Sequence, residues 1–205
     1  LFALYPNVVQ FMVPADSDIT SISQLKGKKI SLGAPGSGTR VSSTNILNIL
    51  GISEDDVNGQ SLNYTATTEA LANGQIDAGV IVGSLGVGAI TELALTRDIR
   101  ILSFTDDELA KIEAAAPAYM EFDAPAETYN NVPAFKTPAI WNVLVVNKGL
   151  DEELAYKMTK AAFENMDQIR QAINVAKYTT LENMDILKGV PLHPGAQRYL
   201  NEMRQ

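Results

Sequence analysis

The chain is organised around Ile30-Ser31-Leu32-Gly33-Ala34-Pro35-Gly36-Ser37-Gly38-Thr39-Arg40. This segment starts with apolar residues, as a buried strand does, and continues with the glycine, proline and serine residues of a tight loop. An amphipathic segment follows, and its apolar side is formed by Val41, Ile46, Leu47, Ile49 and Leu50. The pattern predicts a strand, a loop and the N-terminus of a helix, in that order.

Two roles are open to this loop. The free N–H groups at a helix N-terminus, together with the positive end of the helix dipole, attract anions. The glycines allow the backbone to approach a ligand closely, and Ser37 and Thr39 add hydroxyl donors. The same hydroxyl groups could instead only cap the helix. The residues of the loop do not decide between an anion site and a structural cap.

The composition is that of an ordinary folded protein. The chain has 205 residues, of which 46% are hydrophobic and 20% are charged, so it can form one or two domains with a sizeable core. Its net charge of −8 argues against general binding to nucleic acid but permits a local site for an anion. Without cysteine, the chain can form neither a disulfide bond nor a cysteine-ligated metal site.

Targeting signals are not found in the sequence. No segment is long and apolar enough to cross a membrane. The chain begins at Leu1 without a methionine, and its first residues lack the basic start and cleavage pattern of a signal peptide. We therefore expect that a leader or a larger preceding segment has been removed.

Strands and helices alternate along the first part of the chain. The strands are expected at 8–13, 30–33, 61–64, 78–82 and 99–102. Short connections between them predict a doubly wound α/β layer with a mainly parallel sheet. A second glycine-rich loop, 83–88, follows the buried strand 78–82. Both glycine-rich loops are therefore expected at the carboxyl ends of strands, where such sheets bind ligands.

The second part of the chain has fewer regular patterns. Residues 105–116 predict a helix, whereas the prolines in 118–138 indicate extended surface chain or a crossing between lobes. The strongest strand pattern lies at 140–146, and 151–173 has the spacing of a long helix. The apolar positions of that helix are expected in the core: Leu154, Met158 and Ile169.

The first glycine-rich loop matches no catalytic motif completely. Gly33 and Gly38 have the spacing of a phosphate-binding P-loop, but Thr39-Arg40 replaces its Lys-Ser/Thr pair. A dinucleotide-binding fingerprint requires glycine where Val41 stands. A nucleophile elbow requires glycine where Pro35 stands. These differences argue against phosphate transfer, dinucleotide chemistry and serine hydrolysis.

Catalytic bases and metal ligands are scarce as well. The only histidine, His193, has no neighbouring histidine or cysteine, so a packing role fits it better than a metal site. No Ser-x-x-Lys pair stands near either glycine-rich loop. We therefore expect no catalytic residue, no metal ion and no cofactor. The sequence therefore indicates that the first glycine-rich loop provides hydrogen-bond donors for an anion and no catalytic group.

Several segments, in chain order, resemble the solute-receptor subunits of TRAP transporters of the TAXI family. They are Ala3-Leu4-Tyr5-Pro6, Asp16-Ser17-Asp18-Ile19, Leu25-Lys26-Gly27-Lys28-Lys29-Ile30, Gly33-Ala34-Pro35-Gly36-Ser37-Gly38-Thr39, Gly74-Gln75-Ile76-Asp77-Ala78, Thr96-Arg97-Asp98-Ile99-Arg100 and Pro191-Leu192-His193-Pro194-Gly195-Ala196. The resemblance covers nearly the whole chain, which makes it specific.

The resemblance implies an α/β fold like that of type II periplasmic binding proteins, with one complete doubly wound lobe and part of a second lobe. Such a protein is not an enzyme, and it closes on a small acidic solute such as glutamate or a related dicarboxylate. It delivers the solute to membrane permease subunits that are driven by an ion gradient. The resemblance thus implies a periplasmic or other extracytoplasmic location, a carboxylate ligand, no nucleic-acid partner and no membrane span.

The resemblance also implies the residues of the binding site. Tyr5 is expected to face the cleft. The ligand carboxylate is expected to be held by Gly36, Ser37, Gly38 and Thr39, and the opposite wall of the same lobe to be lined by Gly83 and Ser84. The second loop lacks the proline that is usual in the family, which leaves the identity of the solute open.

The resemblance divides the chain into three parts. Residues 1–13 would form a crossover strand and part of lobe I, 14–137 all of lobe II, and 138–205 the return crossover strand and C-terminal helices of lobe I. Members of the family carry a further N-terminal half-lobe before the segment that matches Leu4-Tyr5-Pro6. We therefore expect 138–205 to expose apolar surface and to be covered by another chain or poorly ordered.

Two other functions are alternatives. The effector-binding domain of a transcriptional regulator can share this fold, although it normally follows a DNA-binding helix-turn-helix. A phosphate-handling transferase could use the glycine-rich loops, but it would lack the lysine and a catalytic base. Assays of turnover and of simple binding to acidic metabolites distinguish these classes.

Overall fold

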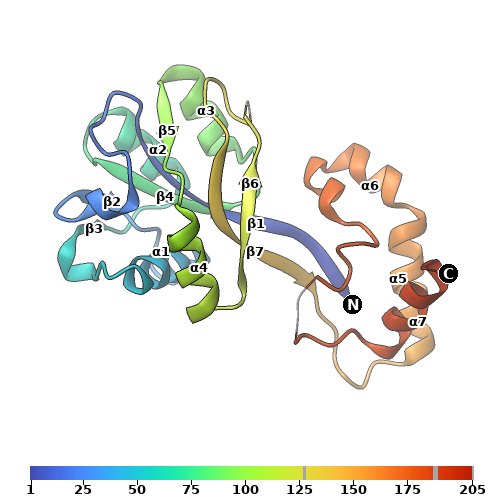
Figure 1. The fold of residues 1–205 in the computed structure, drawn as a ribbon. Coiled ribbons are helices and arrows are strands. Elements are labelled where there is room, and N and C mark those ends of the chain that lie inside the picture. The colour runs from blue at the N-terminus through green and yellow to red at the C-terminus, as the bar shows by residue number, and fades with distance from the viewer. Residues whose placement is uncertain (127, 187–188, 205) are drawn as a thin grey trace. The chain divides into compact units, whose positions relative to one another are not determined.

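The computed structural model describes residues 1–126, 128–186 and 189–204. The chain forms two compact units, which Figure 1 shows as one part with a sheet and one part made mainly of helices. The larger unit is Asn7–Ile140, and the smaller unit combines Leu1–Pro6 with Trp141–Gln205. Two strands belong in part to each unit, β1 (Phe2–Pro14) and β7 (Phe135–Leu144). The chain therefore passes from one unit to the other along strands.

One sheet runs through the larger unit. Its strand order is β3-β2-β4-β1-β7-β6, and β5 pairs with β1 outside this order. The remaining strands are β2 (Lys29–Ser31), β3 (Asn58–Gln60), β4 (Ala78–Gly83), β5 (Ile99–Ile101) and β6 (Tyr119–Ala124).

The sheet is mixed, which corrects the expectation of a mainly parallel sheet. β2 is parallel to β3 and β4, because helices α1 (Gly38–Ile49) and α2 (Tyr64–Ala72) form the crossover connections between these strands. β1 is antiparallel to β4 and β5, and β6 is antiparallel to β7. The antiparallel pairs involve the strands that connect the two units, whose direction no helical crossover sets.

Helices cover both faces of this sheet. Along β1, Val9 and Phe11 belong to one buried cluster and Val8 and Met12 to another, as expected for side chains that alternate between faces. The first cluster contains residues of α1 and of α4 (Asp106–Ala115), and the second contains residues of α2 and of α3 (Gly88–Thr96). The larger unit is therefore a doubly wound α/β lobe, as the sequence predicts.

The strand expected at 61–64 is wrong. Strand β3 ends at Gln60, and Asn63 is the N-cap of α2. Its side chain accepts a hydrogen bond from the N–H of Ala66 at 2.9 Å. A capping side chain that satisfies a free N–H group outweighs the short apolar pattern that suggested a strand.

The segment 118–138 is more regular than expected. It contains β6 and the first residues of β7, which pair from Tyr119 opposite Ile140 to Ala124 opposite Phe135. β7 runs through Pro138, so the strand expected at 140–146 begins earlier than the apolar pattern indicates. Prolines usually mark the ends or edges of strands, and for this reason the sequence pattern did not predict strand β6 or the start of β7.

Helices make up most of the smaller unit. They are α5 (Glu152–Glu164), α6 (Met166–Ala172), a 3-10 helix (Asn174–Tyr178) and α7 (Pro194–Met203). The single helix expected at 151–173 is thus interrupted at Asn165, where α5 ends. The expected burial of Leu154 and Met158 is also wrong, because these side chains are 47% and 40% exposed.

Close packing of α5 against α7 explains this exposure. Ala155 and Thr159 form the buried side of α5. Gly195 of α7 lies so near to α5 that a Cβ atom on it would come within 2.2 Å of the carbonyl oxygen of Glu152. Small residues allow such an approach. The larger apolar residues of α5 therefore stay exposed.

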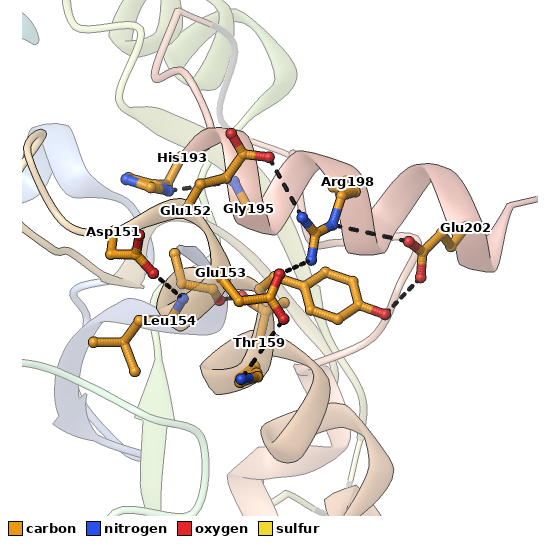
Figure 2. Close-up of polar contacts among 12 residues, drawn as sticks. Asp151, Glu152, Glu153, Leu154, Thr159, His193, Gly195, Arg198 and Glu202 are labelled. Atoms are coloured by element: carbon orange, nitrogen blue, oxygen red, sulfur yellow. Dashed lines mark hydrogen bonds and ion pairs between the residues drawn. The ribbon is translucent and has the colours of Figure 1, made fainter.

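Polar contacts join the same two helices (Figure 2). Arg198 of α7 forms an ion pair with Glu153 of α5 at 2.7 Å. His193 is the N-cap of α7, and its Nδ1 accepts a hydrogen bond from the N–H of Gly195 at 3.3 Å. Its Nε2 lies 3.1 Å from the carbonyl oxygen of Leu150. Both ring nitrogens of His193 thus have structural partners, as a packing role requires.

The smaller unit exposes large apolar side chains. They are Leu144, Val145, Leu154, Met158, Ile173, Val190 and Met203. This exposure agrees with the expectation for 138–205, whereas a chain that covers the surface stays a prediction. Among the residues that the structure describes, no helix has the length and apolar character that a membrane crossing requires.

Candidate functional site

The larger unit contains a cavity of about 890 Å³ at the N-termini of α1 and α2. The first glycine-rich loop and the starts of these helices supply most of its wall. The lining residues are Asn7, Ala34, Gly36, Ser37, Gly38, Thr39, Val41, Ser42, Asn63, Tyr64, Thr65, Val82, Tyr119 and Ile140. All four loop residues that were expected to hold a carboxylate, at 36–39, therefore lie on this cavity.

Gly33 allows α1 to begin close to the end of β2. Its φ of +103° is a conformation that favours glycine. A Cβ atom at this position would come within 2.8 Å of the backbone nitrogen of Arg40 and of Cγ2 of Thr39. The turn thus brings the N-terminus of α1 to the carboxyl end of β2, where ligands bind in α/β folds.

Ser37 is the N-cap of α1. Its hydroxyl oxygen accepts a hydrogen bond from the N–H of Arg40 at 3.1 Å and donates one to the carbonyl oxygen of Ala34 at 2.7 Å. The capping role that the sequence left open is therefore confirmed for this hydroxyl group.

The hydroxyl group of Thr39 is part of a closed ring of hydrogen bonds. It accepts from the N–H of Val82 at 3.2 Å and donates to the Tyr64 hydroxyl at 3.3 Å. The Tyr64 hydroxyl donates in turn to the carbonyl oxygen of Val82 at 2.5 Å. Thr39 is only 3% exposed. The hydrogen bonds of the Thr39 hydroxyl therefore connect α1 with α2 and β4, and its proton is donated to a protein atom.

Two backbone N–H groups at the start of α1 have no such partner. The N–H of Arg40 binds the Ser37 hydroxyl, and the N–H of Val41 binds the Ser37 carbonyl oxygen at 3.2 Å. For the N–H groups of Gly38 and Thr39, the described residues provide no acceptor. Because both residues line the cavity, their N–H groups are the donors that a helix N-terminus offers to an anion.

Backbone dipoles give the wall of the cavity partial positive charges. Asn63, Tyr64 and Thr65 at the start of α2 also line it, so the positive ends of two helix dipoles meet there. No lining residue, all of which the structure describes, has a charged side chain. Arg40, which follows the lining residue Thr39 in the sequence, forms an ion pair with Glu54 at 2.5 Å.

Tyr129 fills the equivalent position at the second glycine-rich loop. Its hydroxyl oxygen accepts a hydrogen bond from the N–H of Gly86 at 3.1 Å and donates one to Oε1 of Gln10 at 2.5 Å. Burial raises the pKa of the Tyr129 hydroxyl to about 12. A protein side chain thus occupies the N-terminus of α3, whereas the N-terminus of α1 faces open space.

The remaining predicted site residues lie elsewhere. Gly83 ends β4, where a Cβ atom would be 3.6 Å from the Tyr64 hydroxyl oxygen, and neither Gly83 nor Ser84 lines the cavity. Tyr5 belongs to the smaller unit, where its carbonyl oxygen accepts a hydrogen bond from Nδ2 of Asn142 at 3.1 Å. The binding roles of these three residues stay predictions.

Several lining residues were missed from the sequence. Ser42 could have been found, because it lies four residues after Gly38 and so on the same face of α1. Asn63 could have been found as a helix cap. Tyr119 had no local signal, since its position depends on the pairing of β6 with β7. In the described part of the chain, no cluster of histidine or acidic side chains could hold a metal ion.

Solved structures show the fold class. The structure is similar to the periplasmic aliphatic sulphonate-binding protein SsuA of Escherichia coli, with 17% sequence identity and a TM-score of 0.50, over 97% of this chain and 58% of that one. It is also similar to the periplasmic sulfonate-binding protein SsuA of Methylobacillus flagellatus KT, with 21% identity and a TM-score of 0.49, over 97% of this chain and 51% of that one. The chain has the α/β fold of type II periplasmic binding proteins and spans little more than half the length of these proteins.

Family membership follows from the sequence itself. Residues 1–203 match the NMT1-like family. The match takes in both units of the structure, the cavity and the two glycine-rich loops. The chain therefore belongs to the NMT1-like family.

Proposed function

We propose that the chain is the extracytoplasmic solute-binding part of a membrane transport system and binds a small acidic solute in the cavity of the larger unit. The proposal is carried by the unpaired N–H groups of Gly38 and Thr39 on the wall of a cavity without charged side chains. Such groups bind an anion by charge-assisted hydrogen bonds, each contributing about 1.5–3 kcal/mol. Neither group loses a protein partner when the anion binds.

The four loop residues have different roles in this proposal. Gly38 and Thr39 bind the carboxylate through their backbone N–H groups. Ser37 keeps the helix N-terminus in place through its cap. Gly36, with a φ of +73° and no atom within 4 Å of a Cβ position, leaves room for the solute. Additional contacts from Tyr5, Gly83 and Ser84 rest on the resemblance alone.

The transport system that fits the sequence motifs is a TRAP transporter of the TAXI family. In that case the solute is glutamate or a related dicarboxylate, and the partners are membrane permease subunits. SsuA of Escherichia coli is a sulphonate-binding protein. A sulphonate is an anion, like a carboxylate, so this similarity agrees with an anionic solute. We assign 14–137 to lobe II, and 1–13 with 138–205 to lobe I. The chain performs no catalysis in this proposal.

Calorimetric titration of the purified chain tests the proposal. Glutarate and glutaramide have the same carbon chain, but only glutarate is an anion. We expect glutarate to bind at least about tenfold more tightly than glutaramide, because a neutral amide gains less from the two N–H groups and the helix dipoles. Mass spectrometry of the recovered solute should show no conversion.

Three results contradict the proposal. They are equal binding of glutarate and glutaramide, binding of neither these two nor glutamate, and conversion of the acid to a product. The last result would favour the transferase alternative.

A further inference from the structure

Ser42 carries a hydroxyl group that the protein does not use. It lies in α1, it is 7% exposed, and it lines the cavity. The neighbouring Ser43 and Thr44 both donate to backbone carbonyl oxygens. The hydroxyl of Ser42 has no hydrogen-bond partner among the described residues.

Tyr119 carries a second unused hydroxyl group on the same cavity. The residue lies in β6 opposite Ile140 of β7, and it is 5% exposed. Its hydroxyl group, too, has no partner in the described part of the chain. A hydroxyl group on a cavity wall that has no protein partner can form its hydrogen bonds with water or with a bound solute.

Both hydroxyl groups reach open space. The only side-chain polar atom of the described residues that is both fully buried and unpaired is Nη1 of Arg40. The hydroxyl groups of Ser42 and Tyr119 are also unpaired, but they are not fully buried, so they are accessible. Because both residues line the cavity, these hydroxyl groups are accessible from it. They are therefore placed to bind a solute, together with the N–H groups of Gly38 and Thr39.

The described residues of the cavity wall offer a cation no negative charge. Their side chains include no carboxylate, and two helix dipoles point their positive ends into the cavity. An ammonium group here would lose its hydration without an opposite charge to replace it. Apolar contacts, by contrast, are offered by Val41, Val82 and Ile140.

We infer that the cavity selects an organic acid without an ammonium group, whose anionic group is bound by the hydroxyl groups of Ser42 and Tyr119 in addition to the two N–H groups of α1. This inference rests on the proposed function and narrows it. Among acidic solutes, it favours carboxylic acids with a neutral carbon chain over amino acids.

Pairs of acids that differ only by an α-ammonium group test the solute class. Glutarate and glutamate form one pair, and 4-methylpentanoate and leucine form the other. We expect calorimetric titration of the full chain to show at least about tenfold tighter binding of the acid without ammonium in each pair. Equal or tighter binding of the amino acids overturns the inference while leaving the proposed function intact. If none of the four binds, the proposed function fails and the inference fails with it.

Conservative variants test the two hydroxyl groups. We expect Ser42→Ala and Tyr119→Phe each to weaken glutarate binding about tenfold, since each removes a hydrogen bond to a charged group. The urea unfolding midpoint should stay unchanged, because neither hydroxyl group has a partner in the protein. Ser23→Ala and Tyr156→Phe remove hydroxyl groups outside the cavity and should not change the affinity. Unchanged glutarate affinity in either cavity variant overturns the inference.

Discussion

At the scale of single residues, side chains and backbone groups of the candidate site have different roles. The side chains of Ser37 and Thr39 stabilise the loop, whereas backbone N–H groups are left without a protein partner at the cavity. Ser37 and Thr39 were predicted as hydroxyl donors to a carboxylate, yet both hydroxyl protons are given to protein atoms. The sequence could show that hydroxyl groups stand in the loop. It could not show that the hydroxyl of Thr39 forms hydrogen bonds with Val82 and Tyr64, which are distant in the sequence.

Thr39→Val tests the structural role of this hydroxyl group. Valine keeps the shape of threonine but leaves the buried N–H of Val82 without an acceptor. We expect the free energy of unfolding to fall by about 1–3 kcal/mol in urea denaturation. Thr44→Val is the matched control on the same helix, because the hydroxyl of Thr44 binds helix carbonyl oxygens. A change of less than about 0.5 kcal/mol is expected for the control, and an equally small change for Thr39→Val would contradict the assignment.

Tyr129 predicts a specific dependence of stability on pH. Its pKa is about 12 in the folded protein against a usual value of 10.0, because burial disfavours the tyrosinate. The stability that this tyrosine contributes is fully present below about pH 10 and is lost as the pH rises towards about 12, since the unfolded chain releases its proton first. The gap in unfolding free energy between the wild type and Tyr129→Phe should therefore shrink by roughly 1 kcal/mol from about pH 9 to about pH 11.

Comparing the two proteins at each pH cancels the titration of the other tyrosines and lysines. A gap that stays constant over this range would show that the Tyr129 hydroxyl is not buried in the way that its contacts with Gly86 and Gln10 indicate.

At the scale of helices and strands, local signals succeeded where the partner is close in the sequence. Thr105 and Glu108 form the capping box that starts α4, and this helix was predicted almost to the residue. Strand β6 was missed because its own residues give no clear strand pattern, and only its pairing with β7 defines it. Burial on α5 was misjudged because the position of α7 against Ala155 cannot be read from the spacing of apolar residues.

Gly195→Ala tests the close packing of α5 and α7. The added Cβ atom would come within 2.2 Å of the Glu152 carbonyl oxygen and 2.6 Å of the Tyr156 backbone nitrogen, and neither backbone atom can move away alone. We expect the free energy of unfolding to fall by about 1–3 kcal/mol. Gly88→Ala, at the first residue of α3, adds the same atom where nothing lies within 4 Å and should not destabilise the protein. Equal stability of the two variants would contradict the observed helix contact.

At the scale of the whole molecule, the fold class and the first glycine-rich loop could be predicted from sequence motifs. In the proposed function, the donors of the loop are the N–H groups of Gly38 and Thr39, which have no protein acceptor among the described residues and line the cavity. The other walls of the cavity could not be predicted, because Tyr119 and Ile140 meet through pairing of distant strands. The central claim concerns these N–H groups, since they distinguish a solute-binding lobe from a lobe with an ordinary capped helix.

Gly38→Pro removes one of the two N–H groups and leaves the helix intact. Proline is well tolerated at the first residue of a helix, and Ser37 already has the extended conformation that a residue before proline prefers, with a φ of −81° and a ψ of 153°. Gly38→Ala is the matched control, because its Cβ atom meets nothing within 4 Å and its N–H group remains.

Calorimetric titration of these two variants with glutarate is the most direct test of the binding site. We expect Gly38→Pro to weaken the affinity at least about tenfold, since a hydrogen bond to a charged group is lost, while Gly38→Ala binds as the wild type does. Both variants should keep the unfolding midpoint of the wild type. Wild-type affinity in Gly38→Pro, or an equal loss in Gly38→Ala, would contradict binding of the anion by the N-terminus of α1.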